Sequence, residues 1–87
     1  MKTASAGTME SNDCMMVVST SESRQIDIES IVFKQFGDQI KAVITQLLDE
    51  LNQHHIHVRC YDKGALDYTV RARLITAIHR LEAKDET

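Results

Sequence analysis

Large apolar side chains recur at steps of three and four residues between Phe33 and Leu51. This period is that of an amphipathic α-helix with one face for a hydrophobic core. At ~1.5 Å per residue, such a helix is about 30 Å long, roughly the width of a domain of this size. The 87-residue chain therefore has room for one core, and this helix must cross it from end to end.

Gly37 lies inside this helical pattern. A glycine in a helix costs about 1 kcal/mol relative to alanine. Two interpretations remain open at this point. The helix either begins at Asp38, which is a suitable N-cap, or begins near Val32 and tolerates the glycine because of packing.

Three other stretches have the features of β-strands. Residues 14–19 are rich in apolar and β-branched side chains, and residues 25–29 and 55–61 alternate between apolar and polar types. Only a polar cluster, residues 20–23, stands between the first two stretches. We therefore expect these two strands to form a hairpin.

A second helix is predicted after Gly64, because apolar residues recur every three or four positions from Leu66 to Leu81. The resulting order is β-β-α-β-α. It predicts an α+β fold, a small and mostly antiparallel sheet with two helices packed on one face. The connection from the second strand through the long helix to the third strand is a candidate parallel crossover.

The ends of the chain bound the predicted domain. Residues 1–6 are small and polar, and we expect a flexible N-terminus there. A single domain is predicted over residues 7–84, followed by a short tail at residues 85–87.

Charge and hydropathy exclude several classes of function. The formal net charge is −3, and the excess of acidic residues lies within residues 1–53. Nucleic-acid binding needs a clustered basic face, so no nucleic-acid partner is expected. The chain shows neither a signal-peptide pattern nor the roughly 20 consecutive apolar residues of a membrane span. A cytoplasmic protein without membrane association is therefore predicted.

The cysteines and histidines do not predict a metal site. His54, His55, His57 and Cys60 form the most metal-like cluster. Alternation along a strand places His55 and His57 on one face and Cys60 on the other, so this segment alone cannot supply a tetrahedral site. We interpret the histidines as a solvated strand face, and Cys14 and Cys60 as buried, reduced thiols.

Basic residues near the second helix are interpreted as a solvated, salt-bridged surface. They are Lys63, Arg71, Arg73 and Arg80. Asp67 stands four residues before Arg71, which is a favourable spacing for a helical ion pair. Glycine-rich phosphate-binding motifs are absent from the sequence.

Ser11 lies at a predicted turn with Glu10 and Asp13 nearby. It has neither the Gly-x-Ser-x-Gly frame nor an obvious base, so it is not predicted to be a nucleophile in its own right. Serine, asparagine and aspartate are ordinary turn formers. An exposed serine with acidic flanks also suits modification by another enzyme.

Three blocks of sequence, in order, carry a family resemblance. They are Ala-Gly-Thr-Met-Glu-Ser-x-Asp at 6–13, Lys-Gln-Phe-Gly-Asp-Gln-Ile at 34–40, and Asp-Lys-Gly-Ala-Leu-Asp at 62–67 with Arg-Ala-Arg-Leu at 71–74. With these blocks, the chain resembles the acyl carrier (gamma) subunits of citrate lyase over nearly the whole domain.

The resemblance implies a non-catalytic carrier rather than an enzyme. Ser11 would bear 2'-(5''-phosphoribosyl)-3'-dephospho-CoA through a phosphodiester, attached by a prosthetic-group transferase. The terminal thiol would carry acetyl and citryl groups between an alpha subunit that transfers the acyl group and a beta subunit that cleaves the citryl form to oxaloacetate. Glu10 and Asp13 are hypothesised to help partners recognise the loop.

Two alternatives remain beside this interpretation. Malonate decarboxylase uses a related carrier with the same kind of arm, although the Lys-Gly-Ala-Leu-Asp block at 63–67 favours citrate lyase. A non-carrier α+β interaction domain is the other alternative, because a fold does not fix a function.

Overall fold

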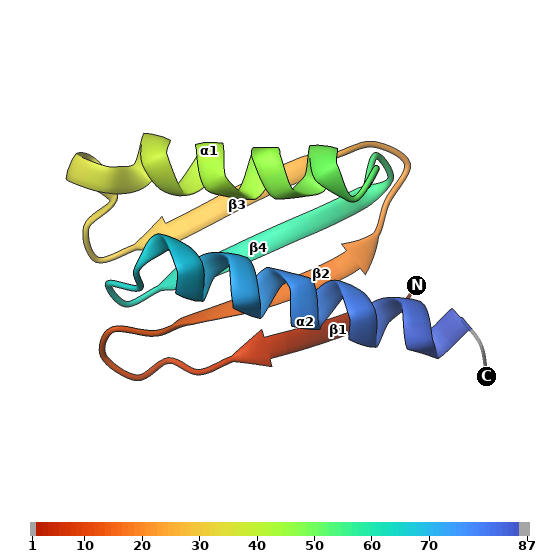
Figure 1. The fold of residues 1–87 in the computed structure, drawn as a ribbon, viewed down its shortest axis with the longest axis horizontal. Coiled ribbons are helices and arrows are strands. Elements are labelled where there is room, and N and C mark those ends of the chain that lie inside the picture. Colours follow the sequence, from red (N-terminus) through yellow and green to blue (C-terminus); the bar gives the residue numbers. More distant parts are fainter. Residues whose placement is uncertain (1, 86–87) are drawn as a thin grey trace.

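The computed structural model describes residues 2–85. The elements follow the order β1 (Thr3–Gly7), β2 (Cys14–Thr20), β3 (Gln25–Ser30), α1 (Phe33–Glu50), β4 (Ile56–Asp62) and α2 (Asp67–Asp85), as Figure 1 shows. The strands lie in the spatial order β1-β2-β4-β3. Two neighbouring pairs are antiparallel and the β3–β4 pair is parallel. The predicted α+β class with a mostly antiparallel sheet is confirmed.

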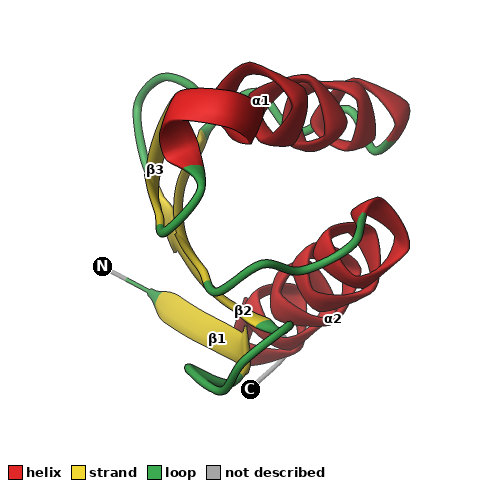
Figure 2. Cartoon of the chain, turned by 90° about the vertical axis from the view of Figure 1, so that its left-hand side faces the viewer, coloured by secondary structure: helices red, strands yellow, loops and turns green. Residues whose placement is uncertain are grey.

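Both helices cover the same face of the sheet, as predicted (Figure 2). Helix α2 packs on β1 and β2, and α1 packs on β3 and against α2. The core lies between these layers, because alternate residues of the two central strands point toward the helices. Its fully buried members include Cys14, Met16, Val18, Ile56, Val58, Cys60, Ile44, Leu48, Leu74 and Ile78.

The prediction of a flexible N-terminus is wrong for residues 3–6, which belong to strand β1. Ala4 and Ala6 are only 6% and 5% exposed, because α2 packs on this strand. Small side chains let the helix approach the sheet closely here. Such residues have weak strand propensity, so this strand could not be predicted from its local sequence.

The predicted hairpin between the second and third strands of the structure is also wrong. Strand β2 pairs with β1 and β4, and β4 lies between β2 and β3. The burial of each strand explains the arrangement. Strand β4 buries every second residue and takes a central position, whereas β3 buries its apolar face only partly and lies at the edge. The predicted parallel crossover is confirmed as β3–α1–β4.

Helix α1 begins at Phe33, so the interpretation in which Gly37 lies within the helix is confirmed. Gly37 is buried. A Cβ atom at this position would lie 2.8 Å from two ring carbons of Phe33, so the glycine makes room for that ring. At the other end of the chain, Asp85 belongs to α2 and residues 86–87 of the predicted tail lie outside the described residues.

Candidate functional site

Ser11 lies in the loop between β1 and β2, at one end of the sheet (Figure 1). The backbone N–H of Asp13 donates to the carbonyl of Glu10 at 3.2 Å and closes a four-residue turn. Asn12 takes a φ of 65°, a left-handed conformation that asparagine tolerates better than most residues. The Ser11 side chain is exposed and makes no hydrogen bond within residues 2–85.

Asp13 is turned inward and holds this loop. Its carboxylate accepts two hydrogen bonds of 2.9 Å from the guanidinium of Arg73 on α2. It also accepts from the Thr8 hydroxyl at 2.7 Å and from the backbone N–H of Cys14 at 2.7 Å. The carboxylate is thus bonded on both oxygens, and Asp13 is only 9% exposed.

These bonds lower the pKa of the Asp13 carboxyl below its usual range. The Arg73 hydrogen bonds are the largest cause, followed by the bond from Thr8, while burial acts in the opposite direction. Asp13 is consequently ionised under all ordinary conditions. The same pair raises the pKa of Arg73, so the ion pair persists.

A second loop, between β4 and α2, braces the Ser11 turn. Asn12 donates its backbone N–H to the carbonyl of Lys63 at 2.8 Å, and Lys63 donates its own to the carbonyl of Asp13 at 2.9 Å. The two loops are therefore joined like neighbouring strands beyond the end of the sheet. The turn that presents Ser11 is fixed from two sides.

Asp62 organises the neighbouring chain ends. Its side chain is only 1% exposed and accepts hydrogen bonds from the Ser30 hydroxyl at 2.7 Å and from the backbone N–H groups of Gly64 and Ala65 at 3.2 and 2.9 Å. Ser30 in turn accepts from the Val32 N–H at 3.1 Å, just before α1. One buried carboxylate thus ties the start of α1 to the β4–α2 loop.

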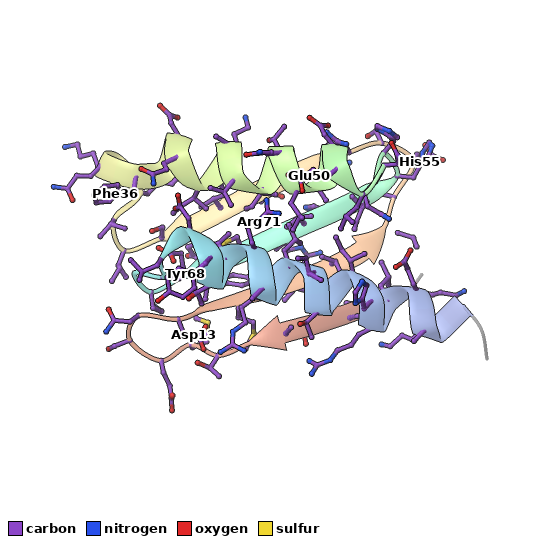
Figure 3. All side chains as sticks on the ribbon, in the orientation of Figure 1. Asp13, Phe36, Glu50, His55, Tyr68 and Arg71 are labelled. Atoms are coloured by element: carbon purple, nitrogen blue, oxygen red, sulfur yellow. The ribbon has the colours of Figure 1, made fainter. Side chains whose placement is uncertain are left out.

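Among residues 2–85, no base is hydrogen-bonded to the Ser11 hydroxyl. Asp13 is already occupied by Arg73, and the segment with three histidines lies at the opposite end of the domain. Figure 3 shows Asp13 and His55 at these two ends. That Ser11 is not a nucleophile in its own right stays a prediction.

The histidines make local contacts. His57 is 2.6 Å from a carboxylate oxygen of Asp27, and His55 is 3.0 Å from the carbonyl of Glu22. No group of three or more potential metal ligands occurs within residues 2–85. Cys14 and Cys60 are free and buried, as predicted, and their mutual hydrogen bond together with burial raises the pKa of the Cys60 thiol.

The structure brings together residues that the sequence analysis did not connect. The interpretation of Arg73 as part of a solvated surface is wrong, because Arg73 fixes the Ser11 loop. Asp62, which had no predicted role of its own, fixes the neighbouring β4–α2 loop. Both lie within the blocks that carry the family resemblance, which was the available signal. The predicted Asp67–Arg71 pair is wrong: Arg71 binds Glu50 at 3.1 Å, and Asp67 accepts from Gln39.

Comparison with known proteins places the chain in a family. The family model of the malonate decarboxylase delta subunit (MdcD), an acyl carrier model, matches residues 1–81.

In the part of the chain that the structure describes, no helix is long and apolar enough to cross a membrane.

A solved structure shares the fold. One chain of the crystal structure of a Pseudomonas malonate decarboxylase hetero-tetramer in complex with malonate superposes with a TM-score of 0.77. The match covers 92% of this chain and 84% of that chain, at 19% sequence identity. At this identity the likeness concerns the fold alone.

Relatives of much higher identity are named citrate lyase acyl carrier protein, and three of them illustrate the match. The protein from Lactiplantibacillus plantarum is 53% identical over 90% of this chain and 82% of its own length. That from Streptococcus mutans is 48% identical over 91% and 79%, and that from Halothermothrix orenii is 44% identical over 91% and 85%. The chain therefore belongs to the family of citrate lyase acyl carrier proteins.

Proposed function

We propose that this chain is the acyl carrier of a citrate lyase complex and that Ser11 is its attachment point. The observation that supports this proposal most directly is that the β1–β2 loop leaves the Ser11 hydroxyl exposed and without a hydrogen bond, while other polar groups of the loop are bonded within the domain. The Thr8 hydroxyl and the Asp13 carboxylate, which lie in the same loop, are both hydrogen-bonded within the domain. Ser11 alone projects its hydroxyl from a braced turn into solvent.

The proposed group at Ser11 is a phosphodiester-linked 2'-(5''-phosphoribosyl)-3'-dephospho-CoA arm. When bound, such an arm supplies a terminal thiol for carrying acyl groups. The loop fits its negative phosphate, because the guanidinium of Arg73 neutralises Asp13, the one buried acid in the loop. The domain holds the attachment point in place. The covalent arm keeps the local concentration of the acyl group high at the partner active sites.

The partners proposed for this carrier are the alpha and beta subunits of citrate lyase and the transferase that attaches the arm. Nucleic acid and membranes are not among them. We propose that the complex works in the cytoplasm, and the two free, buried cysteines suit a reducing compartment.

Glu10 is the proposed recognition residue of the loop. Its side chain is exposed beside Ser11, whereas the carboxylate of Asp13 is engaged inside the domain. Recognition by a partner therefore falls to Glu10, and Asp13 supports it by fixing the turn. Glu10→Lys is expected to slow attachment of the arm, and Glu22→Lys, in the exposed β2–β3 loop, is the matched control.

A malonate decarboxylase-type carrier is the second candidate. The family model and the shared fold agree with it. Relatives at 44–53% identity over most of the chain support citrate lyase instead. Reconstitution distinguishes the two: loaded carrier combined with citrate lyase alpha and beta subunits should release oxaloacetate from citrate, and Ser11→Ala carrier should release none. Equal turnover with the Ser11→Ala chain would contradict the proposal.

A further inference from the structure

A hollow of about 490 Å³ opens beside the Ser11 loop, between the start of α1 and the β4–α2 loop. Figure 3 shows two of its lining residues, Phe36 and Tyr68, at the same end of the domain as Asp13. The residues that matter for its chemistry are Phe36, Gln39, Asp62, Gly64, Leu66 and Tyr68.

The walls of this hollow are apolar and partly aromatic. Phe36, Leu66 and Tyr68 are large side chains that the hydrophobic core leaves exposed, and Tyr68 is 71% exposed. Concave sites with apolar walls and a few polar groups are typical of small-molecule binding. The side chains are therefore placed to cover a ligand rather than to complete the core.

The hollow begins within contact distance of the Ser11 turn. Asn12, the residue after Ser11, donates its N–H to Lys63 at 2.8 Å. The Asn12 side-chain oxygen lies 3.7 Å from the position that a Cβ on Gly64 would occupy, and Gly64 lines the hollow. A group attached to Ser11 is thus joined to the chain next to the edge of the hollow.

The polar groups of the hollow exclude phosphate and accept an uncharged ring. Its lining contains Asp62 and Asp67 but neither lysine nor arginine. Both Asp62 oxygens are already bonded, and both Asp67 oxygens accept from the Gln39 amide nitrogen at 3.1 Å. This leaves the Gln39 carbonyl oxygen as an acceptor for an exocyclic amine.

We propose that the hollow holds the nucleobase of the arm carried on Ser11, stacked against Tyr68 and next to Phe36. This inference rests on the proposed function, in which Ser11 carries a nucleotide-containing arm. A planar, uncharged base matches the aromatic side chains of the hollow, whereas the carboxylates of Asp62 and Asp67 disfavour phosphate there. Stacking on aromatic side chains is a general mode of base binding. Docking the base shortens the mobile part of the arm, so that mainly its thiol end samples the partner active sites.

The experiment uses the loaded full-length chain, with loading first established by intact mass. The chain contains two tyrosines and no tryptophan, so Tyr61→Phe leaves Tyr68 as its only tyrosine fluorophore. Loading is expected to quench Tyr68 fluorescence.

In NMR spectra, the ring protons of the base should show contacts with Tyr68 and Leu66. Tyr68→Ala should lower the docked-to-free ratio of the base about fivefold or more, as expected for loss of one stack.

Tyr61→Ala is the matched control, because Tyr61 alternates with the buried residues of β4 and lies on the sheet face opposite the helices, where it lines a shallow hollow together with Asp27 and Glu29 of β3. It should leave the base contacts unchanged. A fully loaded chain without quenching and without base contacts to Tyr68 would overturn this inference while leaving the proposed function intact. A chain that carries no added mass although it was purified from a complex that actively cleaves citrate would overturn the proposed function. In that case a titration of the unloaded chain with free adenosine tests whether the hollow itself binds a base: shifts at Gln39 and Tyr68 show that it does, and their absence overturns the inference as well.

Discussion

The carboxylate of Asp13 and the guanidinium of Arg73, sixty residues apart in sequence, meet in two hydrogen bonds of 2.9 Å each. This pair fastens the loop that carries Ser11 to the middle of helix α2. A two-point contact between planar groups fixes orientation as well as distance. The position of Ser11 therefore depends on a residue that is far from it in the sequence.

Removing Arg73 should destabilise the domain and loosen the loop. Arg73→Ala leaves the buried Asp13 carboxylate with only Thr8 and the Cys14 N–H as partners. Arg71→Ala is the control, since Arg71 forms an exposed pair with Glu50 two positions away on the same helix. Thermal unfolding should show a clearly larger fall in Tm for Arg73→Ala, and amide exchange at residues 10–13 should accelerate only in that variant. Equal behaviour of the two variants would contradict the assigned role.

The Asp13 pair also predicts a pH dependence of stability. The pKa of Asp13 is lowered in the folded state relative to about 3.9 in the unfolded chain. Its contribution to stability is therefore complete above the unfolded-state pKa and is lost as the pH falls through the folded-state value. In urea unfolding, the stability difference between the native chain and Asp13→Asn should be largest near neutral pH and shrink below about pH 4. In an Arg73→Gln background the difference should depend much less on pH.

Gly7 should tolerate no side chain, because it adopts a φ of +101° just before the Ser11 loop. A Cβ there would lie 1.9 Å from the carbonyl oxygen of Cys14. Gly64 is the matched control: it has a φ of +92°, but its nearest neighbour would be 3.7 Å away. Gly64→Ala should therefore cost about 1–3 kcal/mol from backbone strain alone, and Gly7→Ala should cost distinctly more in chemical denaturation. Similar losses in both variants would show that the close approach at Gly7 is relieved elsewhere.

The buried Asp62 should be one of the most sensitive polar residues in the chain. Asp62→Ala removes the acceptor for Ser30, Gly64 and Ala65 and leaves these donors in a largely buried site. A loss of unfolding free energy of about 1–3 kcal/mol for each buried donor left without a partner is expected. Asp38→Ala, on the exposed side of α1, serves as control and should change stability by no more than about 0.5 kcal/mol.

The helices and three of the four strands could be predicted from the periodicity and composition of local sequence. The spacing of apolar residues in α1 and α2, the alternation in β3 and β4 and the apolar, β-branched content of β2 depend on local sequence, and each correctly predicted an element. Strand β1 was missed because alanine, serine and glycine have low strand propensity, although Ala4 and Ala6 are buried by α2. The strand order could not be read locally, because β4 enters the sheet between two strands made earlier in the chain.

The candidate site could likewise be predicted only where it depends on local sequence. The exposed turn at Ser11 followed from its residue types, but the burial of Asp13 did not, since it depends on Arg73 arriving from α2. The hollow formed by Phe36 and Tyr68 joins two segments with no local relation in sequence. Long-range contacts of this kind had no local signature, apart from the blocks shared with the carrier family.

The central claim is tested most directly by the mass of the Ser11 peptide from carrier purified with its native complex. Cleavage before Asp13 gives a peptide of residues 1–12 in which Ser5 and Ser11 are the only serines. We expect this peptide to carry the added mass of a phosphoribosyl-dephospho-CoA group, to keep it in Ser5→Ala and to lose it in Ser11→Ala. An unmodified peptide in a complex that actively cleaves citrate would contradict the account.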